Sequence, residues 1–445
     1  MKPSKINHLQ SRLFETRLSD LLNPNHELYK LSEKINWAYL EEECASVFID
    51  NNKGGHPPKP VRLMLGLLML EHIHNHSDEE VVARWVENPY WQYFCGYDYL
   101  QWEMPIDPTS LTRWRKRLGE ERLEKLLTET IKVALRTKVV KKNSLKKVIS
   151  DTTVMEKNVA FPTDGKLYDT ARKHLVKTAS QAKICLRQNY NQLAKKHLRK
   201  IGQYAHAKQY KRMRKEIKRM KIYLQRIVRD IKRKWEGKKD HFKEIMPLAE
   251  RLLNQEKKSK EKLYSLCHPE VECISKGKAH KKYEFGCKAA LVTTHKEGLC
   301  VSMEAMHGNP YDDHTIKQAI ANAEKLSQAT IDQIFLDKGY KGAKIEGKEI
   351  YRSGQKKGLT KSLKKALKRR QSIEPHIGHM KSDGKLGRNY LKGKEGDRNN
   401  AILVGIGHNL RMVLRKLRVL FAHFFCRLQI VLCWRFLKTQ KGAIN

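Results

Sequence analysis

The residues with the clearest chemical potential lie between Arg370 and Lys381, where one acid stands between two cations. Arg370, Glu374 and Lys381 are separated by four and seven residues, so on an α-helix their side chains fall close to one stripe. Pro375 lacks a backbone N–H, which predicts a kink or a new helix start there. A carboxylate can bind a hard cation such as Mg²⁺, and Arg and Lys can contact phosphate. The same spacing fits an exposed helix with ordinary ion pairs, so this motif alone does not establish a function.

Two other acids follow short β-branched or aromatic runs upstream. The segment KKVISDTTV contains Asp151, and DQIFLDKGYKG contains Asp337. Each run predicts a strand with its aspartate near the end, where the side chain can leave the core and reach a cleft. Together with SIEPHIGHMK and LGRNYLKGKEGDRNNAIL, these segments resemble the bacterial DDE transposases of the insertion-sequence four/five-like superfamily. The glutamate of that family lies in an Arg-x3-Glu-x6-Lys signature.

The resemblance extends over most of the chain. Near the N-terminus, GGHPPKPVRLMLGLLML and DPTSLTRWRKRL are similar to the amino-terminal domain of the same enzymes. One position departs from the family pattern, which often has a tyrosine three residues before the arginine. Leu367 stands at that position here, so this chain lacks the tyrosine and any role that it has in the family. The assignment of the glutamate is not affected.

The resemblance implies a DNA transposase of an insertion sequence. Asp151, Asp337 and Glu374 would be the catalytic acids and the ligands of two Mg²⁺ ions, with Mn²⁺ as an alternative. Arg370 and Lys381 would contact DNA phosphate or orient the glutamate. The enzyme would bind terminal inverted repeats and target DNA, and would cut and transfer strands without a covalent protein–DNA intermediate. It would act as a homo-oligomer in the active DNA complex.

Two other interpretations stay open from the sequence. A catalytically inactive RNase H-like DNA-binding or architectural protein would keep the fold and the basic surface but would not nick DNA in the presence of metal. An RNA-binding helical scaffold would explain the basic helices but would leave the three acids without a role. Competition between duplex DNA and RNA separates this last interpretation from the others.

The charge and composition indicate a globular, polyanion-binding protein. The 445 residues include 90 Lys and Arg against 48 Asp and Glu, a formal charge of +42, and 40% hydrophobic residues. The segment MKPSKINHLQSRLF has no apolar signal core. The apolar tail VLFAHFFCRLQIVLCWRFL is interrupted by Arg427 and Arg435, so we expect a buried helix there instead of a membrane span. DNA is therefore favoured over a membrane surface, and we expect a cytoplasmic, nucleoid-associated protein.

The cysteines do not indicate a metal site. Nine cysteines lack paired spacing, as expected in a reducing compartment. Cys267, His268 and Cys273 come closest to a metal cluster, but a second Cys or His pair at short spacing is missing. We therefore do not expect structural zinc.

The first 140 residues predict an all-helical DNA-binding domain. Ser77 and Glu80 form a capping box, and a helix begins after Asp107 and ends at Gly119. This helix is short and basic, which suits an element that reads a DNA groove, although a solvated helix face is the structural alternative. Its expected DNA contacts are Arg113, Arg115, Lys116 and Arg117, around Trp114.

The remaining chain predicts an α/β fold with a mixed RNase H-like sheet flanked by helices. Between residues 195 and 239 we count 19 Lys or Arg against three acids, in a region almost free of Gly and Pro. We expect a basic helical insertion after the first strand, which could pack as a coiled-coil hairpin and bind DNA on its other face. The expected order is helical domain 1–140, first part of the catalytic core 141–169, insertion 170–265, remainder of the core 266–400 and C-terminal helical tail 401–445.

Overall fold

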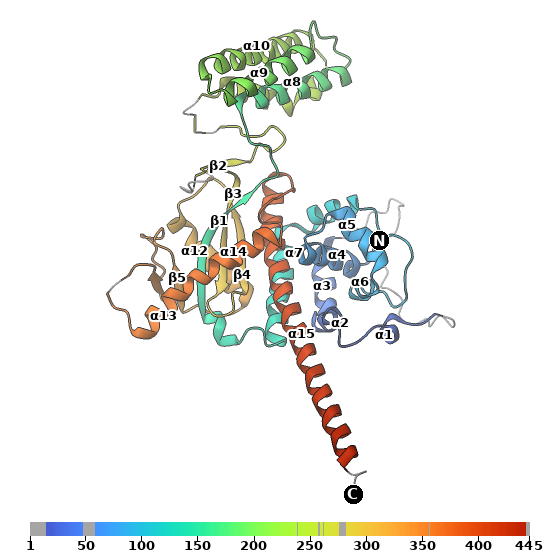
Figure 1. Cartoon of the computed structure of the whole chain (residues 1–445). Coiled ribbons are helices and arrows are strands. Elements are labelled where there is room, and N and C mark those ends of the chain that lie inside the picture. Colours follow the sequence, from blue (N-terminus) through green and yellow to red (C-terminus); the bar gives the residue numbers. More distant parts are fainter. Residues whose placement is uncertain are drawn as a thin grey trace.

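The computed structural model describes residues 15–47, 58–237, 239–256, 259–260, 262–275, 282–355 and 357–441, with side chains up to residue 419. The chain is a mixed α/β protein in which helices surround one sheet and a group of helices lies apart from it (Figure 1). The mixed α/β class predicted from the sequence is confirmed.

The N-terminal region is helical, as predicted. Its helices are α1 Leu18–Leu21, α2 Glu27–Lys34, α3 Trp37–Cys44, α4 Val61–His74, α5 Asp78–Glu87, α6 Pro89–Phe94 and α7 Thr109–Arg136, with a 3₁₀ turn at Ala45–Val47. The side chain of Ser77 accepts a hydrogen bond from the N–H of Glu80 at 3.1 Å, which confirms the predicted start of α5. Gly119 has φ +67° and interrupts α7, so the predicted break is present, and a second helical segment follows it.

Six strands form a single mixed sheet. They are β1 Lys147–Glu156, β2 Glu272–Ile274, β3 Glu284–Thr294, β4 Cys300–Met306, β5 Gln333–Leu336 and β6 Glu349–Arg352. β3 pairs antiparallel with β1 along one edge, and with β2 and β4 along the other. β5 pairs parallel with β1, and β6 pairs parallel with β5. The carboxyl ends of β1, β5 and β6 therefore point the same way.

Helices cover both faces of this sheet. They are α12 Asp312–Ser327, α13 Lys361–Arg369, α14 Ile373–Ser382 and α15 Gly393–Lys441. A 3₁₀ turn at Lys142–Lys146 precedes β1, and another at Arg370–Ser372 lies between α13 and α14. Ile316 and Ile320 of α12 pack on one face, where Val148 of β1 also points. Ile373 and Met380 of α14 pack on the other face with Ile149 and Met155 of β1. The alternation of side chains along β1 therefore assigns each residue to one of the two faces.

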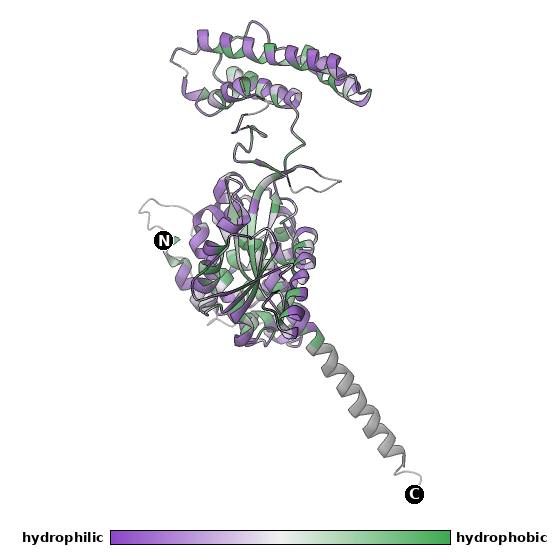
Figure 2. Cartoon of the chain, turned by 90° about the vertical axis from the view of Figure 1, so that its left-hand side faces the viewer, coloured by the Kyte–Doolittle hydropathy of each residue, from purple (hydrophilic) through white to green (hydrophobic). Residues whose placement is uncertain are grey.

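The helical unit 164–254 leaves the sheet after β1 and the chain returns before β2. It consists of α8 Asp164–Gln181, α9 Asn191–His206, α10 Tyr210–Lys234 and α11 Ile245–Asn254, with a 3₁₀ turn at Lys239–Phe242. Its own hydrophobic core includes Leu175, Leu224 and Leu252. The helices lie above the sheet in Figure 1, and Figure 2 colours many of their residues as hydrophilic, with hydrophobic residues between them.

The N-terminal helices share one hydrophobic core with the sheet and with α15. Leu127 of α7, Val301 of β4, Ile320 of α12 and Leu403 of α15 belong to the same cluster of buried side chains. This core is continuous across residue 140, where we expected a domain boundary. Experiments on the N-terminal helices therefore require the full chain, because a fragment would expose the surface that packs on α15.

The C-terminal tail is helical, as predicted, because α15 continues to Lys441. The burial that we expected for the apolar tail concerns side chains beyond residue 419, which lie outside the described residues. Among the residues described, no helix is both long and apolar enough to cross a membrane.

The turn between β3 and β4 positions α14, and it gives a test of this packing. Gly298 has φ +77°, and a β-carbon there would overlap the imidazole of His376 on α14. Gly298→Ala should lower the free energy of unfolding by roughly 2–4 kcal/mol, because backbone strain and steric overlap combine. Urea unfolding measures the change. Gly308→Ala is the control, since Gly308 has φ +87° and open space at the β-carbon. Equal losses in the two variants would contradict the packing role of Gly298.

Candidate active site

The parallel pairing of β1 and β5 places two of the predicted acids at the same height along the strand direction. Ile149 of β1 lies opposite Phe335 of β5. If this register continues for two residues, Asp151 stands beside Asp337, which directly follows β5. Asp151 shares the face of Ile149, because side chains two apart on a strand point the same way. This is the face that α14 covers.

The guanidinium of Arg370 joins the three predicted acids. Its Nη1 lies 3.5 Å from Oδ2 of Asp151, and its Nη2 lies 3.4 Å from Oδ1 of Asp337 and 3.6 Å from Oε1 of Glu374. These acids come from β1, from the end of β5 and from α14, and they are up to 223 residues apart in the sequence. One buried cation therefore contacts three carboxylates from separate elements.

The site opens to solvent on the side of the carboxylates. The side chain of Arg370 is 7% exposed, whereas those of Asp151, Asp337 and Glu374 are 22%, 49% and 67% exposed. The guanidinium thus lies beneath the acids and leaves carboxylate oxygen accessible from outside. Three accessible carboxylates that converge in this way are a suitable donor set for hard divalent cations, which prefer oxygen ligands.

The helix that carries the acid is not continuous, which departs from the simplest form of the predicted stripe. Arg370 lies in a 3₁₀ turn after α13, and α14 begins at Ile373, so Glu374 is in its first turn. The predicted new helix start is present, two residues before Pro375. Lys381 lies in the last turn of α14, about 10 Å along the axis from Glu374, so it is not part of the Arg370 cluster.

Tyr340 is a buried residue that the sequence interpretation did not include, and it packs in the cluster on the face of the sheet that α12 covers. Its side chain is 1% exposed, and burial raises the pKa of its phenol, with the charges of Asp151 and Asp312 adding to the shift. Its phenol therefore stays protonated. The only sequence signal is an aromatic residue three positions after Asp337, and a tyrosine in such a position is more often part of a core.

Asp312 is a separate acid with a structural role. Its Oδ1 accepts hydrogen bonds from Oγ1 of Thr152 at 2.7 Å and from Nζ of Lys288 at 3.1 Å. Thr152 points away from the face of Asp151, because adjacent residues of a strand alternate. Asp312 therefore ties α12 to the sheet on the opposite face.

In the helix that we expected to bind DNA, which is the first part of α7, three of the four predicted DNA contacts are exposed to solvent. Arg113, Lys116 and Arg117 are exposed. Arg115 is buried, and its Nη1 lies 2.9 Å from carboxylate oxygen of both Glu71 and Asp78.

The expectation that Arg115 contacts DNA is corrected by this geometry. Its guanidinium already neutralises two acids inside the protein, and it would have to leave them to reach a phosphate. Trp114 is also buried, so it belongs to the core instead of the centre of a basic surface. The spacing of charges along the sequence could not distinguish these inward-facing residues from their exposed neighbours.

A second cluster of possible metal ligands is already neutralised by an internal cation. Cys287, His307 and Asp397 place ligand atoms within 4.8 Å of one another. However, Nζ of Lys157 lies 2.6 Å from Oδ1 of Asp397 and 2.9 Å from Glu270. Nε2 of His307 lies 3.0 Å from Oδ2 of Asp397, and burial raises the pKa of the Cys287 thiol. We therefore interpret this cluster as a buried ion network that joins β1, β4 and α15.

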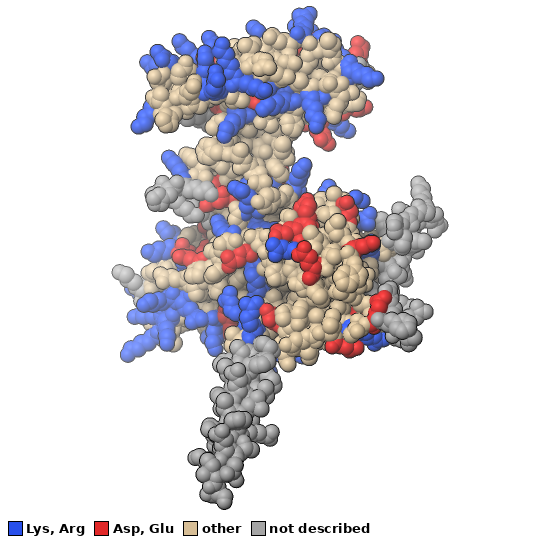
Figure 3. Space-filling model, turned by 45° about the vertical axis from the view of Figure 1, so that its right-hand side comes forward, with Lys and Arg blue, Asp and Glu red and all other residues tan. Residues whose placement is uncertain are grey.

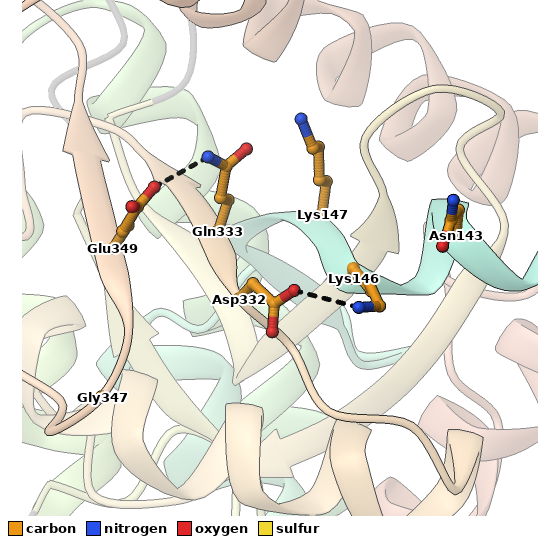
Figure 4. A pocket seen from close by; sticks show the side chains of 7 residues that line it. All are labelled: Asn143, Lys146, Lys147, Asp332, Gln333, Gly347 and Glu349. Atoms are coloured by element: carbon orange, nitrogen blue, oxygen red, sulfur yellow. Dashed lines mark hydrogen bonds and ion pairs between the residues drawn. The ribbon is translucent and has the colours of Figure 1, made fainter.

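A surface pocket lies at the other end of the parallel strands (Figure 4). It is lined by Asn143, Lys146, Lys147, Asp332, Gln333, Gly347 and Glu349. Within it, Lys146 lies 3.6 Å from Asp332, and the amide of Gln333 donates to Glu349 at 2.7 Å. These residues precede or begin β1, β5 and β6, whereas Asp151 lies in the middle of β1 and Asp337 follows the carboxyl end of β5. This pocket is therefore separate from the candidate active site.

The helical unit 164–254 carries a strongly basic surface. The acids of α10 that could offset this charge face inward: Glu216 lies 3.0 Å from Arg219 and also contacts His197, and Asp230 lies 3.1 Å from Lys234. Figure 3 shows Lys and Arg crowding the visible surface of the unit. Such a surface suits a polyanion.

Two transposase family models match the chain. The model described as Transposase domain (DUF772) matches residues 16–117, and the model described as Transposase DDE domain matches residues 255–410. The first match includes the three exposed cations of α7, and the second includes Asp337, Arg370 and Glu374. Asp151 lies between the two matched regions.

A curated relative supports a common origin without adding an activity. It is the "Uncharacterized protein ORF8 in nfe locus" of Rhizobium meliloti, which is 44% identical over 210 residues. The alignment covers 47% of this chain and the whole of that protein. No solved structure matches the chain.

The ion pairs of Arg370 can be tested by their effect on stability. Arg370→Leu leaves three carboxylates without their shared cation and should lower the free energy of unfolding in EDTA by about 1–3 kcal/mol, less than for a fully buried pair because the acids contact water. Added Ca²⁺ should restore more stability in this variant than it adds to the parent protein, because the ion can replace the missing charge. Thermal unfolding with and without Ca²⁺ measures both effects.

Arg369→Leu is the matched control for this experiment. Arg369 is exposed, and its Nε donates to the backbone carbonyl of His295 at 3.2 Å. Its loss should therefore give no gain in the response to Ca²⁺. If Arg370→Leu and Arg369→Leu respond alike, the guanidinium of Arg370 does not balance the acids.

Proposed function

Because the chain belongs to the DDE transposases of insertion sequences, we propose that it binds the terminal inverted repeats of its own element and catalyses metal-dependent DNA cleavage and strand transfer. The family consists of polynucleotidyl transferases that act on DNA. We place the chain within the four/five-like superfamily on the Arg370, Glu374 and Lys381 spacing. The observation that carries the proposal is the convergence of Asp151, Asp337 and Glu374 at Arg370.

The sheet topology supports an RNase H-like catalytic core. Three antiparallel strands, β1, β3 and β4, are extended by β5 and β6 parallel to β1, and helices lie on both faces. In this interpretation, the helical unit 164–254 is an insertion after the first strand. The insertion leaves the core on one side of the sheet and does not separate the paired strands.

Asp151, Asp337 and Glu374 are proposed as the catalytic acids and as the ligands of two Mg²⁺ ions, with Mn²⁺ as an alternative. The structure fits this assignment because three hard oxygen donors converge and remain accessible. When bound, a metal pair supplies Lewis-acid activation of the attacking oxygen and charge stabilisation of the leaving oxygen. The middle of β1 holds Asp151 and the end of β5 holds Asp337, whereas the sequence predicted both aspartates near strand ends. Helix α14 brings the glutamate to them.

The cations around the acids have different tasks in this proposal. Arg370 orients the three carboxylates and offsets their mutual repulsion, because its guanidinium contacts each of them. Lys381, on the same helix as Glu374 but farther along the axis, is placed to hold a DNA phosphate beyond the acids.

Recognition of the element ends is assigned to the N-terminal helices. Arg113, Lys116 and Arg117 are exposed on α7 and can contact base edges or phosphates. The basic face of the helical unit would hold additional DNA. The active complex is proposed to be a homo-oligomer that joins two ends and target DNA, and to work in the cytoplasm at the nucleoid.

The charge of Glu374 gives a direct test of the catalytic assignment. Glu374→Gln keeps the size of the side chain but removes the anion that helps to hold a metal ion. Cleavage and strand transfer of an end-containing duplex should both fall by several orders of magnitude, while DNA binding is retained. Asp151→Asn and Asp337→Asn should behave alike, and double variants should add little, because residues that act as a unit are not additive.

Asp383→Asn is the matched control for Glu374→Gln. Asp383 is an exposed acid at the end of α14, where it pairs with His379 at 2.8 Å and not with Arg370. Its removal should leave the rate unchanged. If Glu374→Gln cuts at the parent rate, the acid assignment is wrong, and if the parent binds but never cuts, a catalytically inactive DNA-binding protein is favoured.

The basic helical unit gives a second test through the salt dependence of binding. Neutralising four exposed cations together should flatten the slope of log affinity against log salt by roughly 0.9 for each phosphate contact that is lost. The four are Lys211, Arg212, Arg214 and Lys215. Affinity for divalent metal should not change. An unchanged slope would make the unit a packing or oligomerisation element.

A further inference from the structure

Helix α13 carries a surface of lysines that has no part in the assignments above. The segment from Ser353 to Ile373 contains no Asp or Glu. Four lysines of α13 are exposed: Lys361, Lys364, Lys365 and Lys368. None of them forms an ion pair in the part of the chain that the structure describes.

The arrangement of these lysines is unfavourable for an isolated helix. Lys364 and Lys365 follow Lys361 by three and four residues. Lys368 in turn follows Lys364 by four residues and Lys365 by three. Side chains at these spacings are neighbours on a helix, and like charges there destabilise it. An ordinary solvated helix face would mix signs to avoid this cost. A bound polyanion would remove it.

The rest of the protein holds α13 firmly in place. Ala366 and Leu367 pack on the core cluster that includes Phe335 and Ile373. Nε2 of His295, in the turn between β3 and β4, lies 2.8 Å from the carbonyl oxygen of Ala366. The lysines therefore project from an anchored element, so binding a ligand does not require the helix itself to become ordered.

The position of α13 relates this surface to the acids. Arg370 directly follows the last residue of α13 and begins the 3₁₀ turn, and it contacts the three acids Asp151, Asp337 and Glu374. From Lys361 to Lys368 the helix rises about 10 Å, which corresponds to roughly three phosphates along one DNA strand. A strand that runs along α13 would thus enter the site of the acids at the end near Arg370.

We propose that Lys361, Lys364, Lys365 and Lys368 form a phosphate-binding rail for the DNA strand that lies next to the cleaved phosphate. The inference rests on the proposed function, because it takes the acids as the place of cleavage. It assigns α13 to the DNA beside the cut, whereas α7 and the helical unit contact the element farther away. An acidic protein is the other partner that lysines could bind, and the test separates the two.

The test maps contacts in the full chain carrying Glu374→Gln, so that the DNA remains uncut. A photo-crosslinking residue, p-benzoyl-phenylalanine, is introduced at Ser362, which is exposed on α13. After irradiation with an end-containing duplex, crosslinks should map to nucleotides within a few positions of the cleavage site. The same probe at Tyr210, which is 51% exposed on α10, should map elsewhere.

A set of substitutions measures the contribution of the charges. Replacing the four lysines with Gln should flatten the salt dependence of binding by roughly 0.9 for each lost phosphate contact. In the protein with an intact Glu374, it should lower the single-turnover cleavage rate more than neutralising Lys211, Arg212, Arg214 and Lys215 does. Gln preserves helix propensity, and thermal unfolding checks that the variant is folded.

The outcomes distinguish this inference from the proposed function. Crosslinks from Ser362 that map far from the cut, or an unchanged salt dependence, would overturn the rail even if Glu374 proves essential for cleavage. Conversely, if Glu374→Gln cuts normally, the catalytic assignment fails, while the crosslinks still report where α13 meets DNA. Crosslinks to a second protein chain but none to DNA would favour the acidic partner.

Discussion

The contact of Arg370 with Asp151, Asp337 and Glu374 is the interaction on which the candidate site depends. Three carboxylates that converge without a counter-charge repel one another, and their elements would tend to separate. A buried guanidinium with several donors can serve all three acids at once, which a lysine ammonium could not do with the same geometry. The position of α14 therefore depends on the ion pairs of Arg370 as well as on the hydrophobic packing of the helix against the sheet.

The sheet provides the rigid part of this arrangement. β1 and β5 are parallel neighbours, so their register fixes Asp151 relative to Asp337 through backbone hydrogen bonds. Glu374 depends instead on side-chain packing, because Ile373 and Met380 hold α14 on the sheet and His376 lies against Gly298. The two aspartates are thus positioned by the backbone, whereas the glutamate is positioned by the core.

Some cations of the protein form ion pairs with acids in its interior, whereas others are exposed on its surface. Glu71 of α4 contacts Arg115 of α7 and also Lys385, which follows α14, so it connects the N-terminal helices to the catalytic side of the molecule. Among the residues that the structure describes, no acid forms an ion pair with the exposed lysines of α13. The excess of positive charge is therefore concentrated where DNA is proposed to lie, and the internal cations are those that neighbouring carboxylates already neutralise.

The sequence by itself determined the elements and the residue types of the site. β-branched runs predicted the strands around Asp151 and Asp337, and capping residues and helical periodicity predicted most helices, because these signals depend on neighbours within a few residues. The tertiary structure decided which side chains face inward and which acids meet. Arg115 is buried although Arg113 and Lys116 are exposed, and one guanidinium, that of Arg370, contacts acids from three separate elements. Those outcomes depend on packing between segments far apart in the chain, which no local pattern of residues contains.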